Sequence, residues 1–231
     1  MWDLRCGIKR KAVVSQRKQS NEVCRYVLGG VFMKKMVLML VPCFFLFIAA
    51  IPKAAAAVWC IEEADAPKHF NYFCPRAIAI DGSNYPHVAY GGDRLYYAYY
   101  DGSGWHYETV DSSPEVGAYA SLVLDSEGKA HIGYLDRLNW GLKYATNKSG
   151  AWIIETIENA GLTYGCISLV LDSNAKAHIS YPRYPDGALK YTTHKTGTWI
   201  TETVDSAAMV GASTSLDLDS EGKAHISYDD E

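Results

Sequence analysis

One segment of the chain runs Ser121-Leu122-Val123-Leu124-Asp125-Ser126-Glu127-Gly128-Lys129-Ala130-His131-Ile132-Gly133-Tyr134. It returns as residues 168–181 and as residues 215–228, and a diverged copy occupies residues 77–90. Each copy carries one anchoring aspartate, and these are Asp81, Asp125, Asp172 and Asp219. A unit that recurs at a nearly fixed period of about 45 residues is typical of a repeat architecture.

Each unit predicts four short strands. Residues 121–125 are small or apolar on both faces, as in a strand buried on both sides. A turn follows, and residues 130–134 then alternate with the period of a half-buried strand. Residues 142–145 and 152–156 supply a third and a fourth strand. Four strands per repeat of about 45 residues predict an all-β fold, the four-stranded blade of a β-propeller.

The copies divide residues 58–231 into blades. We expect full blades at residues 77–120, 121–167 and 168–214, and half of a fourth at residues 215–231. The fourth strand of a blade begins with a tryptophan three residues before a glutamate, and Trp59 repeats this spacing ahead of the first full blade. Residues 58–231 therefore predict a leading outer strand, three full blades and half a fourth. We interpret this as a truncated propeller from a longer protein.

The N-terminal part differs in charge from the rest. The whole chain has a formal net charge of -4, but residues 1–57 are strongly basic and residues 58–231 are acidic. Residues 33–57 combine a basic start, an apolar run and a small-residue end, which predicts a secretory signal peptide cleaved after Ala57. Residues 1–32 show no periodicity and are interpreted as a non-native upstream extension before a start at Met33. The alternative is a signal-anchored protein with a short cytoplasmic tail.

This organisation predicts where the protein acts and what it avoids. We expect a secreted, periplasmic or cell-surface protein with no stable membrane span after signal cleavage. An acidic mature chain disfavours nucleic acid as a partner. The chain has no zinc-type ligand spacing and no phosphate-binding glycine loop, so we expect no metal and no cofactor.

Residues that repeat in every blade are expected to build the scaffold. A histidine follows each anchoring aspartate by six residues, at His87, His131, His178 and His225. An aspartate and a histidine across one hairpin can form a charge-assisted hydrogen bond. The fourth-strand tryptophans are Trp59, Trp105, Trp152 and Trp199, and we expect them to pack between blades. None of these positions is predicted to be catalytic.

Residues that depart from the repeat are better candidates for a site. The loop between the second and third strands differs in every blade and carries one arginine each time: Arg94, Arg137 and Arg183. Three guanidinium groups from successive blades can converge on a carboxylate or sulfate. Trp140 and Tyr184 lie in the same loops, where their rings can stack on a sugar. The alternative is that these are solvated hairpin tips.

Three cysteines remain after the predicted cleavage. An exported chain meets oxidants, so we expect a disulfide between Cys60 and Cys74. Cys166 falls at nearly the same repeat position as Cys74, and a Cys74–Cys166 bridge between blades is the weaker alternative.

The repeated unit, as in Leu218–Tyr228, resembles the tandem repeats of large secreted bacterial β-propellers, loosely grouped with sialidase-like and kelch-like propellers. The resemblance covers residues 59–231 and implies a secreted binding or scaffold module, with carbohydrate or another extracellular protein as its partner. The alternatives are a sialidase-like glycosidase acting on acidic glycans and a structural repeat domain of a surface adhesin. The Asp-box of sialidases is not matched, because Asp125–Gly128 has another spacing and no tryptophan follows.

The processing hypothesis can be tested directly. We expect N-terminal sequencing of the exported protein to start at Val58, because the small residues before it fit signal peptidase. A chain that starts before Met33 contradicts the assigned start.

Overall fold

The structure, a computed structural model, describes residues 12–17, 58–63, 74, 76–159, 165–183, 186–207 and 210–230. The chain divides into two compact units, Met1–Glu63 and Ala64–Glu231. In the first unit, strand β1 (Ala12–Arg17) pairs antiparallel with β2 (Val58–Glu63). The sequence predicts no regular element before Met33, and β1 corrects this. Residues 58–63, where the sequence predicts a leading strand, form β2, and its partner is β1.

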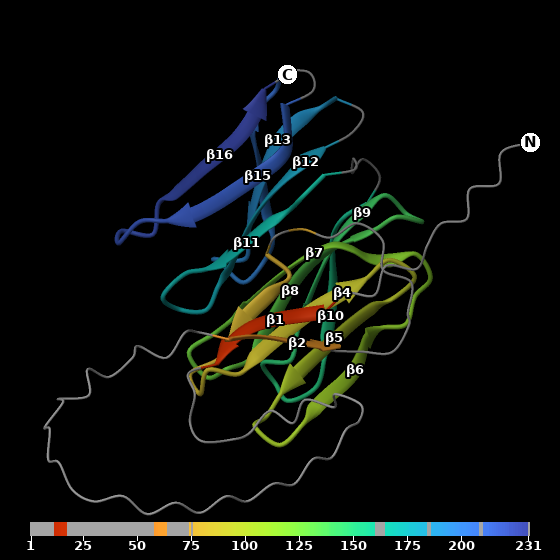
Figure 1. Cartoon of the computed structure of the whole chain (residues 1–231). Helices are drawn as coiled ribbons and strands as arrows, with labels where there is room; N and C mark the ends of the chain where they lie inside the picture. Colours follow the sequence, from red (N-terminus) through yellow and green to blue (C-terminus); the bar gives the residue numbers. More distant parts are fainter. Residues whose placement is uncertain are drawn as a thin grey trace, which may run out of the picture. The chain divides into compact units, whose positions relative to one another are not determined.

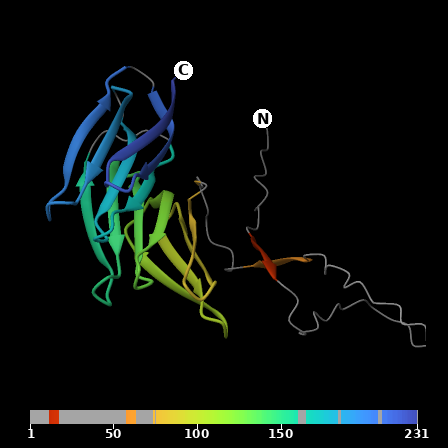
Figure 2. The same cartoon turned by 90° about the vertical axis from the view of Figure 1, so that its left-hand side faces the viewer.

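The second unit is made of sheets (Figures 1 and 2). Three are four-stranded and antiparallel, and the strands of each are consecutive along the chain. The first sheet contains β3 (Ile78–Ile80), β4 (Pro86–Gly91), β5 (Leu95–Tyr100) and β6 (Trp105–Asp111). The second contains β7 (Val116–Leu124), β8 (Ala130–Asp136), β9 (Gly141–Thr146) and β10 (Ile153–Glu158). The third contains β11 (Ser168–Leu171), β12 (Ala177–Arg183), β13 (Ala188–Thr193) and β14 (Ile200–Asp205).

A two-stranded half sheet follows, made of β15 (Val210–Leu218) and β16 (Ala224–Asp230). These sheets confirm the all-β prediction and the four strands per repeat, while the described strands form no closed sheet. The part of the chain that the structure describes holds no helix long and apolar enough to cross a membrane.

The anchoring aspartate forms the turn between the first and second strands of each sheet. The Oδ1 atom of Asp125 accepts hydrogen bonds from the backbone N–H groups of Glu127 and Lys129, both at 2.9 Å. Asp81, Asp172 and Asp219 accept from the same two positions of their own turns. Gly128 closes the turn at φ +74°, in the left-handed region where glycine is favoured. The repeated sequence therefore encodes a side-chain-stabilised turn.

The hydrophobic core lies between adjacent sheets. One cluster joins Tyr97 and Val110 of the first sheet to Leu122 and Ile132 of the second. A second cluster joins the second and third sheets in the same way. The outer-strand tryptophans extend this packing: Trp152 meets Tyr97 edge-on with ring centroids 5.3 Å apart, and the next sheet repeats the arrangement.

Polar contacts cross each boundary between sheets at fixed offsets along the sequence. The Trp152 indole Nε1 donates to Glu108 Oε2 at 2.5 Å, and Trp199 donates to Glu155 at 2.6 Å, each across 44 residues. The Ser168 hydroxyl oxygen accepts from the backbone N–H of Leu216 at 2.9 Å, across 48 residues. We call this set of contacts between two neighbouring sheets the inter-sheet joint.

A third contact completes the joint. A tyrosine near the end of the second strand donates its O–H to a carboxylate at the end of the preceding sheet's outer strand. The pairs are Tyr134–Asp111 at 2.8 Å, Tyr181–Glu158 at 2.5 Å and Tyr228–Asp205 at 2.8 Å, all 23 residues apart. The same tyrosine–carboxylate hydrogen bond thus links each sheet to the next at three successive boundaries.

Two contacts bring distant parts of the second unit together. Cys74 forms a disulfide with Cys166, with Cα atoms 5.5 Å apart, so the pairing of Cys60 with Cys74 is wrong and the weaker alternative is present. The two residues occupy similar repeat positions, just before the first and the third sheet, and their Cα separation is within disulfide reach. Arg76, just before β3, donates to the backbone oxygen of Leu216 at 3.1 Å and to Ser215 at 2.6 Å. The start of the first sheet therefore contacts the half sheet.

The serine contact gives a stability prediction. Ser168→Ala leaves the buried N–H of Leu216 without that acceptor, so we expect a loss of about 1–3 kcal/mol in the free energy of unfolding, measured in urea. Ser126→Ala, at an exposed turn position, is the control and should change stability by less than about 0.5 kcal/mol. Equal effects of the two substitutions would contradict a stabilising role for the Ser168–Leu216 hydrogen bond.

Candidate functional site

The repeated histidines lie inside the sheets. The Nδ1 atom of His131 shares a hydrogen bond with the Tyr144 hydroxyl, and its Nε2 faces Asp125 Oδ2 at 3.4 Å. His87 and His178 repeat the arrangement with Tyr97 and Tyr191. Burial lowers the pKa of His87, His131 and His178, so the neutral imidazole is favoured. These side chains are sequestered from ligands.

The described residues also lack a metal centre. No group of three or more histidine, cysteine, aspartate or glutamate side chains could hold a metal ion in the described ranges. His225, in the half sheet, differs from the other three histidines because it is exposed, with Nε2 3.1 Å from Asp219.

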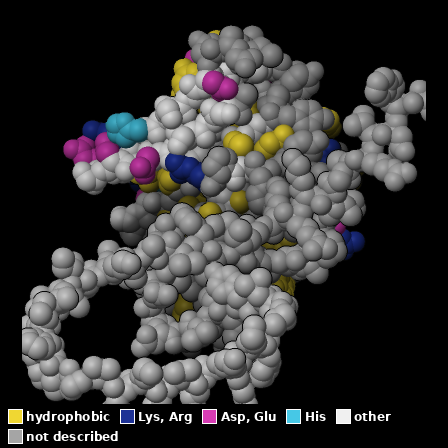
Figure 3. Space-filling view, in the orientation of Figure 1, with side chains coloured by type: hydrophobic (Ala, Val, Ile, Leu, Met, Phe, Trp, Pro, Cys, Tyr) yellow, Lys and Arg dark blue, Asp and Glu magenta, His cyan; other side chains and the backbone are white. Residues whose placement is uncertain are grey.

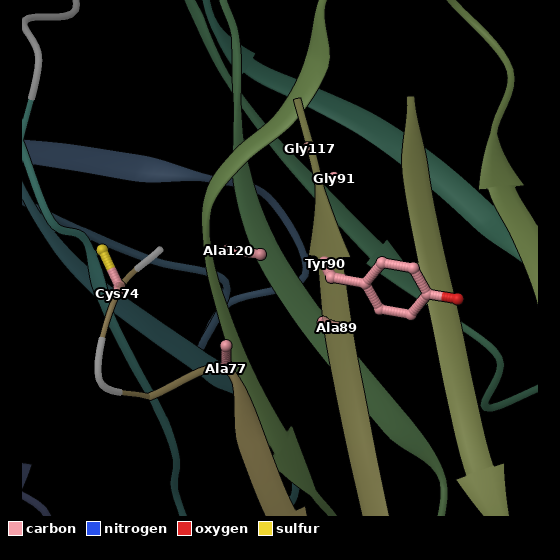
Figure 4. Close-up of a pocket in the computed structure, with 7 residues that line it drawn as sticks. All are labelled: Cys74, Ala77, Ala89, Tyr90, Gly91, Gly117 and Ala120. Carbon is pink, nitrogen blue, oxygen red and sulfur yellow. The ribbon is translucent and has the colours of Figure 1, made fainter. Parts of the chain in front are cut away.

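A narrow apolar crevice, too small to hold a water molecule, lies beside β4 (Figure 4). Alanine and glycine line most of it, together with Cys74, and the Tyr90 ring points away from Cys74 and Ala77. The lining brings no set of polar groups together, which a ligand pocket needs to orient its ligand. We therefore regard the crevice as a packing gap between sheets.

The glycines of this crevice hold a neighbouring loop in place. A Cβ atom on Gly91 or Gly117 would lie 2.0 or 2.6 Å from the backbone oxygen of Arg94, which no side chain tolerates. Only glycine at both positions lets the β4–β5 loop lie against the start of β7. The loop that carries Arg94 is therefore fixed to the second sheet.

Three loops join into one surface at this end of the sheets. The backbone N–H of Glu115 donates to the backbone oxygen of Asp93, and the backbone N–H of Arg137 donates to the backbone oxygen of Glu115, both at 2.9 Å. The Arg137 guanidinium also contacts Glu115 Oε2 at 3.1 Å. We call Asp93, Arg94, Glu115, Arg137 and Trp140 the loop patch.

Trp140 is the unusual member of the loop patch. Its φ is +51°, and its side chain is 43% exposed. The equivalent residue of the third sheet is Gly187, with φ +68°, so the turn itself favours glycine. A bulky residue in this left-handed region costs about 1–2 kcal/mol. Asp136 supports the turn by accepting from the Asn139 backbone and side chain at 3.0 and 2.9 Å.

The three loop arginines have different surroundings. Arg94 is exposed and makes no ion pair with any described residue. Arg137 is paired with Glu115, and both belong to the loop patch. Arg183 pairs with Glu158 at the end of the second sheet, at 2.9 Å, and with Asp186 in its own loop, at 2.7 Å. The structure thus brings Arg94 and Arg137 onto one surface, whereas the Arg183 guanidinium is paired with Glu158 and Asp186. Tyr184 lies outside the described residues.

Three carboxylates of the inter-sheet joint are polar groups that the sequence pattern does not single out. They are Asp111, Glu158 and Asp205, and we call them the joint carboxylates. Burial raises the pKa of Asp111, but hydrogen bonds from Lys143, Ser113 and Tyr134 outweigh it and hold that pKa at about 2. Lys143 Nζ lies 2.5 Å from Asp111 Oδ2. The constant offset of 23 residues between carboxylate and tyrosine is the sequence signal that could have revealed this network.

Comparison with known proteins places the fold. No protein-family model and no curated protein sequence matches the chain. Among solved structures, a mutant of AofleA from Arthrobotrys oligospora, in which three arginines are replaced by alanine, matches with a TM-score of 0.54 and 13% identity. The match covers 77% of this chain and 56% of that one, so the chain spans about half the length of AofleA.

Two further structures match with lower TM-scores. An intramolecular trans-sialidase from Ruminococcus gnavus matches at 0.44 and 16% identity, over 65% of this chain and 37% of that one. An engineered GH43 glycoside hydrolase matches at 0.33 and 12% identity, over 74% and 31%. At these identities the similarity to AofleA shows the fold alone: an all-β, propeller-like arrangement of four-stranded sheets.

The buried histidines give a pH prediction. The ordinary histidine pKa is 6.5, and burial lowers it for His131 in the folded protein. Acidification therefore protonates the unfolded chain first, so stability present above pH 6.5 is lost as the pH falls below it. We expect the urea midpoint to fall between pH 7.5 and 5.5, and His131→Gln to reduce that fall. A midpoint that is constant or rises on acidification would refute this.

Proposed function

We propose that this chain is part of a β-propeller that serves as an exported carbohydrate-binding module, with the loop patch as its contact surface. The observation that carries the proposal is Trp140, a large exposed ring kept in a backbone conformation that the equivalent position fills with glycine. The equivalent position of the third sheet avoids this strain with glycine, so the ring at Trp140 is not required by the turn itself. Such outliers concentrate at ligand-binding sites.

The chemistry of the loop patch suits a sugar. A sugar ring has an apolar C–H face, which packs on an indole, and hydroxyl groups on its rim, which need hydrogen-bond donors and acceptors. Glu115 and Arg137 supply an acceptor and a donor in the loop patch. Arg94 is exposed and makes no ion pair within the described part of the chain, so its guanidinium can bind a carboxylate on an acidic sugar.

Binding fits this surface better than hydrolysis. Glycoside cleavage needs two carboxyl groups that flank one bond. The joint carboxylates Asp111, Glu158 and Asp205 each accept a tyrosine hydrogen bond instead. A sialidase-like activity is therefore the second candidate, and the same glycan experiment tests it. The Cys74–Cys166 disulfide supports the proposed export, since disulfides persist in oxidising compartments.

Trp140→Gly separates binding from folding. The substitution removes the ring and also relieves the positive-φ strain, so we expect glycan affinity to fall at least tenfold while stability stays equal or rises by up to about 1 kcal/mol. A glycan array with neutral and acidic sugars identifies the ligand, and calorimetry then measures the variants. Arg94→Ala should reduce binding of acidic glycans more than that of neutral ones.

Leu138→Ala is the matched control, because Leu138 lies in the same loop and is 58% exposed. It should leave both affinity and stability unchanged. Full glycan binding by Trp140→Gly, or no binding of any glycan by the parent, would contradict the proposal. Release of sugar from an acidic glycan would favour the glycosidase candidate.

A further inference from the structure

A lysine is buried at the joint between the first and second sheets. Charged side chains that lie at the surface, such as those coloured dark blue and magenta in Figure 3, are solvated by water. Lys143, in β9, differs from them because its side chain is only 10% exposed. Its Nζ atom lies 2.5 Å from Oδ2 of Asp111, the joint carboxylate of the first sheet. A buried ion pair is costly to desolvate, so its presence alone is weak evidence for a role in stability.

The joint between the second and third sheets shows that the fold does not require such a pair. Lys190 has the repeat position of Lys143 in the third sheet. Its Nζ donates to Thr203 Oγ1 at 2.6 Å, in an exposed contact within its own sheet. The joint carboxylate at this boundary is Glu158, and it is paired with the Arg183 guanidinium instead. The buried lysine is therefore a feature of the joint next to the loop patch and not of the repeat.

Asp111 connects this lysine to the loop patch. The Oδ2 atom of Asp111 accepts from Lys143 and, at 2.8 Å, from the Tyr134 hydroxyl. Its Oδ1 atom accepts from the backbone N–H of Ser113 at 2.9 Å. Ser113 lies two residues before Glu115, whose backbone N–H and oxygen link the three loops of the patch. The two donors on Oδ2 thus fix the carboxylate that holds the segment before Glu115.

A second buried carboxylate leads to Trp140. Tyr134 and Asp136 are alternate residues of β8, so their side chains lie on one face of the sheet, and Lys143 stands opposite Tyr134 in the register. Asp136 accepts from the backbone N–H and the side-chain amide of Asn139, the residue before Trp140. The lysine therefore has one buried carboxylate on the same face of its own sheet and one across the joint. Each of them holds one loop of the patch.

The lysine maintains the charge of Asp111. Burial raises the pKa of this carboxyl, and hydrogen bonds from Lys143, Ser113 and Tyr134, with Lys143 the largest effect, hold that pKa at about 2. An ionised carboxylate accepts the Ser113 N–H more strongly than a neutral carboxyl does, because charge-assisted hydrogen bonds are stronger than neutral ones. Without Lys143, burial favours the protonated form of Asp111 and weakens its hold on the segment that leads to Glu115.

We propose that Lys143 is a positioning residue of the loop patch, which acts through the Asp111 carboxylate on the segment that carries Glu115. The inference rests on the proposed carbohydrate binding by this patch. Because the lysine is buried, it contributes to affinity through the geometry of the loops and not by contact with the sugar. Loops that are already ordered lose less conformational entropy when a ligand binds, so the positioned patch binds more tightly.

Lys143→Met tests this role, with Lys190→Met as its matched control. Methionine keeps an unbranched chain at either position and removes the charge. We expect Lys143→Met to weaken glycan binding about tenfold, because the loops of the patch are less ordered, and Lys190→Met to bind as the parent does. Calorimetry with the glycan that the array identifies measures both variants.

Hydrogen exchange measures the positioning without a glycan. In Lys143→Met, exchange at the backbone amides of Ser113 and Glu115 should become about tenfold faster, because the acceptor for Ser113 is weakened. The amide of Leu216, which bonds to Ser168 at another boundary, should exchange as in the parent. If the parent binds no glycan and this local change is present, the proposed function fails while the positioning role stands.

A double variant keeps the test decisive if Lys143→Met does not fold. In Asp111→Asn the amide oxygen accepts from Ser113 without a charge, so the buried cation is no longer needed. Asp111→Asn combined with Lys143→Met should therefore fold, restore slow exchange at Ser113 and Glu115, and bind glycan within about threefold of the parent.

Three results would overturn the proposal. These are equal effects of Lys143→Met and Lys190→Met, exchange at Ser113 and Glu115 that is unchanged in Lys143→Met, and a double variant that folds but leaves exchange at these amides fast.

Discussion

The inter-sheet joint is the constraint on which the second unit depends. A single antiparallel four-stranded sheet has two faces, and the apolar residues of this chain lie on the faces between sheets. Apolar packing alone would let neighbouring sheets slide, because hydrophobic contacts are not directional. The tryptophan–glutamate and tyrosine–carboxylate bonds add direction at fixed offsets of 44 and 23 residues. The repeat period therefore sets the placement of each sheet on the next.

The same joints separate scaffold from function. Histidines, joint carboxylates and outer-strand tryptophans are repeated, and each is hydrogen-bonded within the scaffold, so the proposed binding surface lies in the loops that differ. The loop patch lies at the joint between the first and second sheets, where backbone hydrogen bonds from Glu115 and Arg137 link three loops. A binding surface on rigid, bonded loops loses little entropy when a ligand binds.

Much of the fold follows from the repeat, since its alternation and turn residues predict the strands of the second unit, and Asp125 and Gly128 predict the turn chemistry. The site is less predictable, because an arginine in a loop is the same letter whether it is exposed like Arg94 or paired like Arg183. The strain at Trp140 is a property of its backbone φ angle, which the sequence does not reveal. The comparison with Gly187, which has a similar φ, shows that the turn favours glycine there. Sequence proximity assigns the disulfide to Cys60 wrongly, because Cys74 instead pairs with Cys166, which lies at a similar repeat position two repeats later.

The central claim is that directional polar contacts hold adjacent sheets together, and a double-mutant cycle on Trp152 and Glu108 measures it most directly. Trp152→Phe keeps an aromatic ring against Tyr97 and removes the indole donor, while Glu108→Ala removes the acceptor; the cycle cancels the change in ring size. A charge-assisted bond across the joint predicts a coupling energy of at least about 1 kcal/mol in the free energy of unfolding. Additive effects, with coupling near zero, would contradict the account.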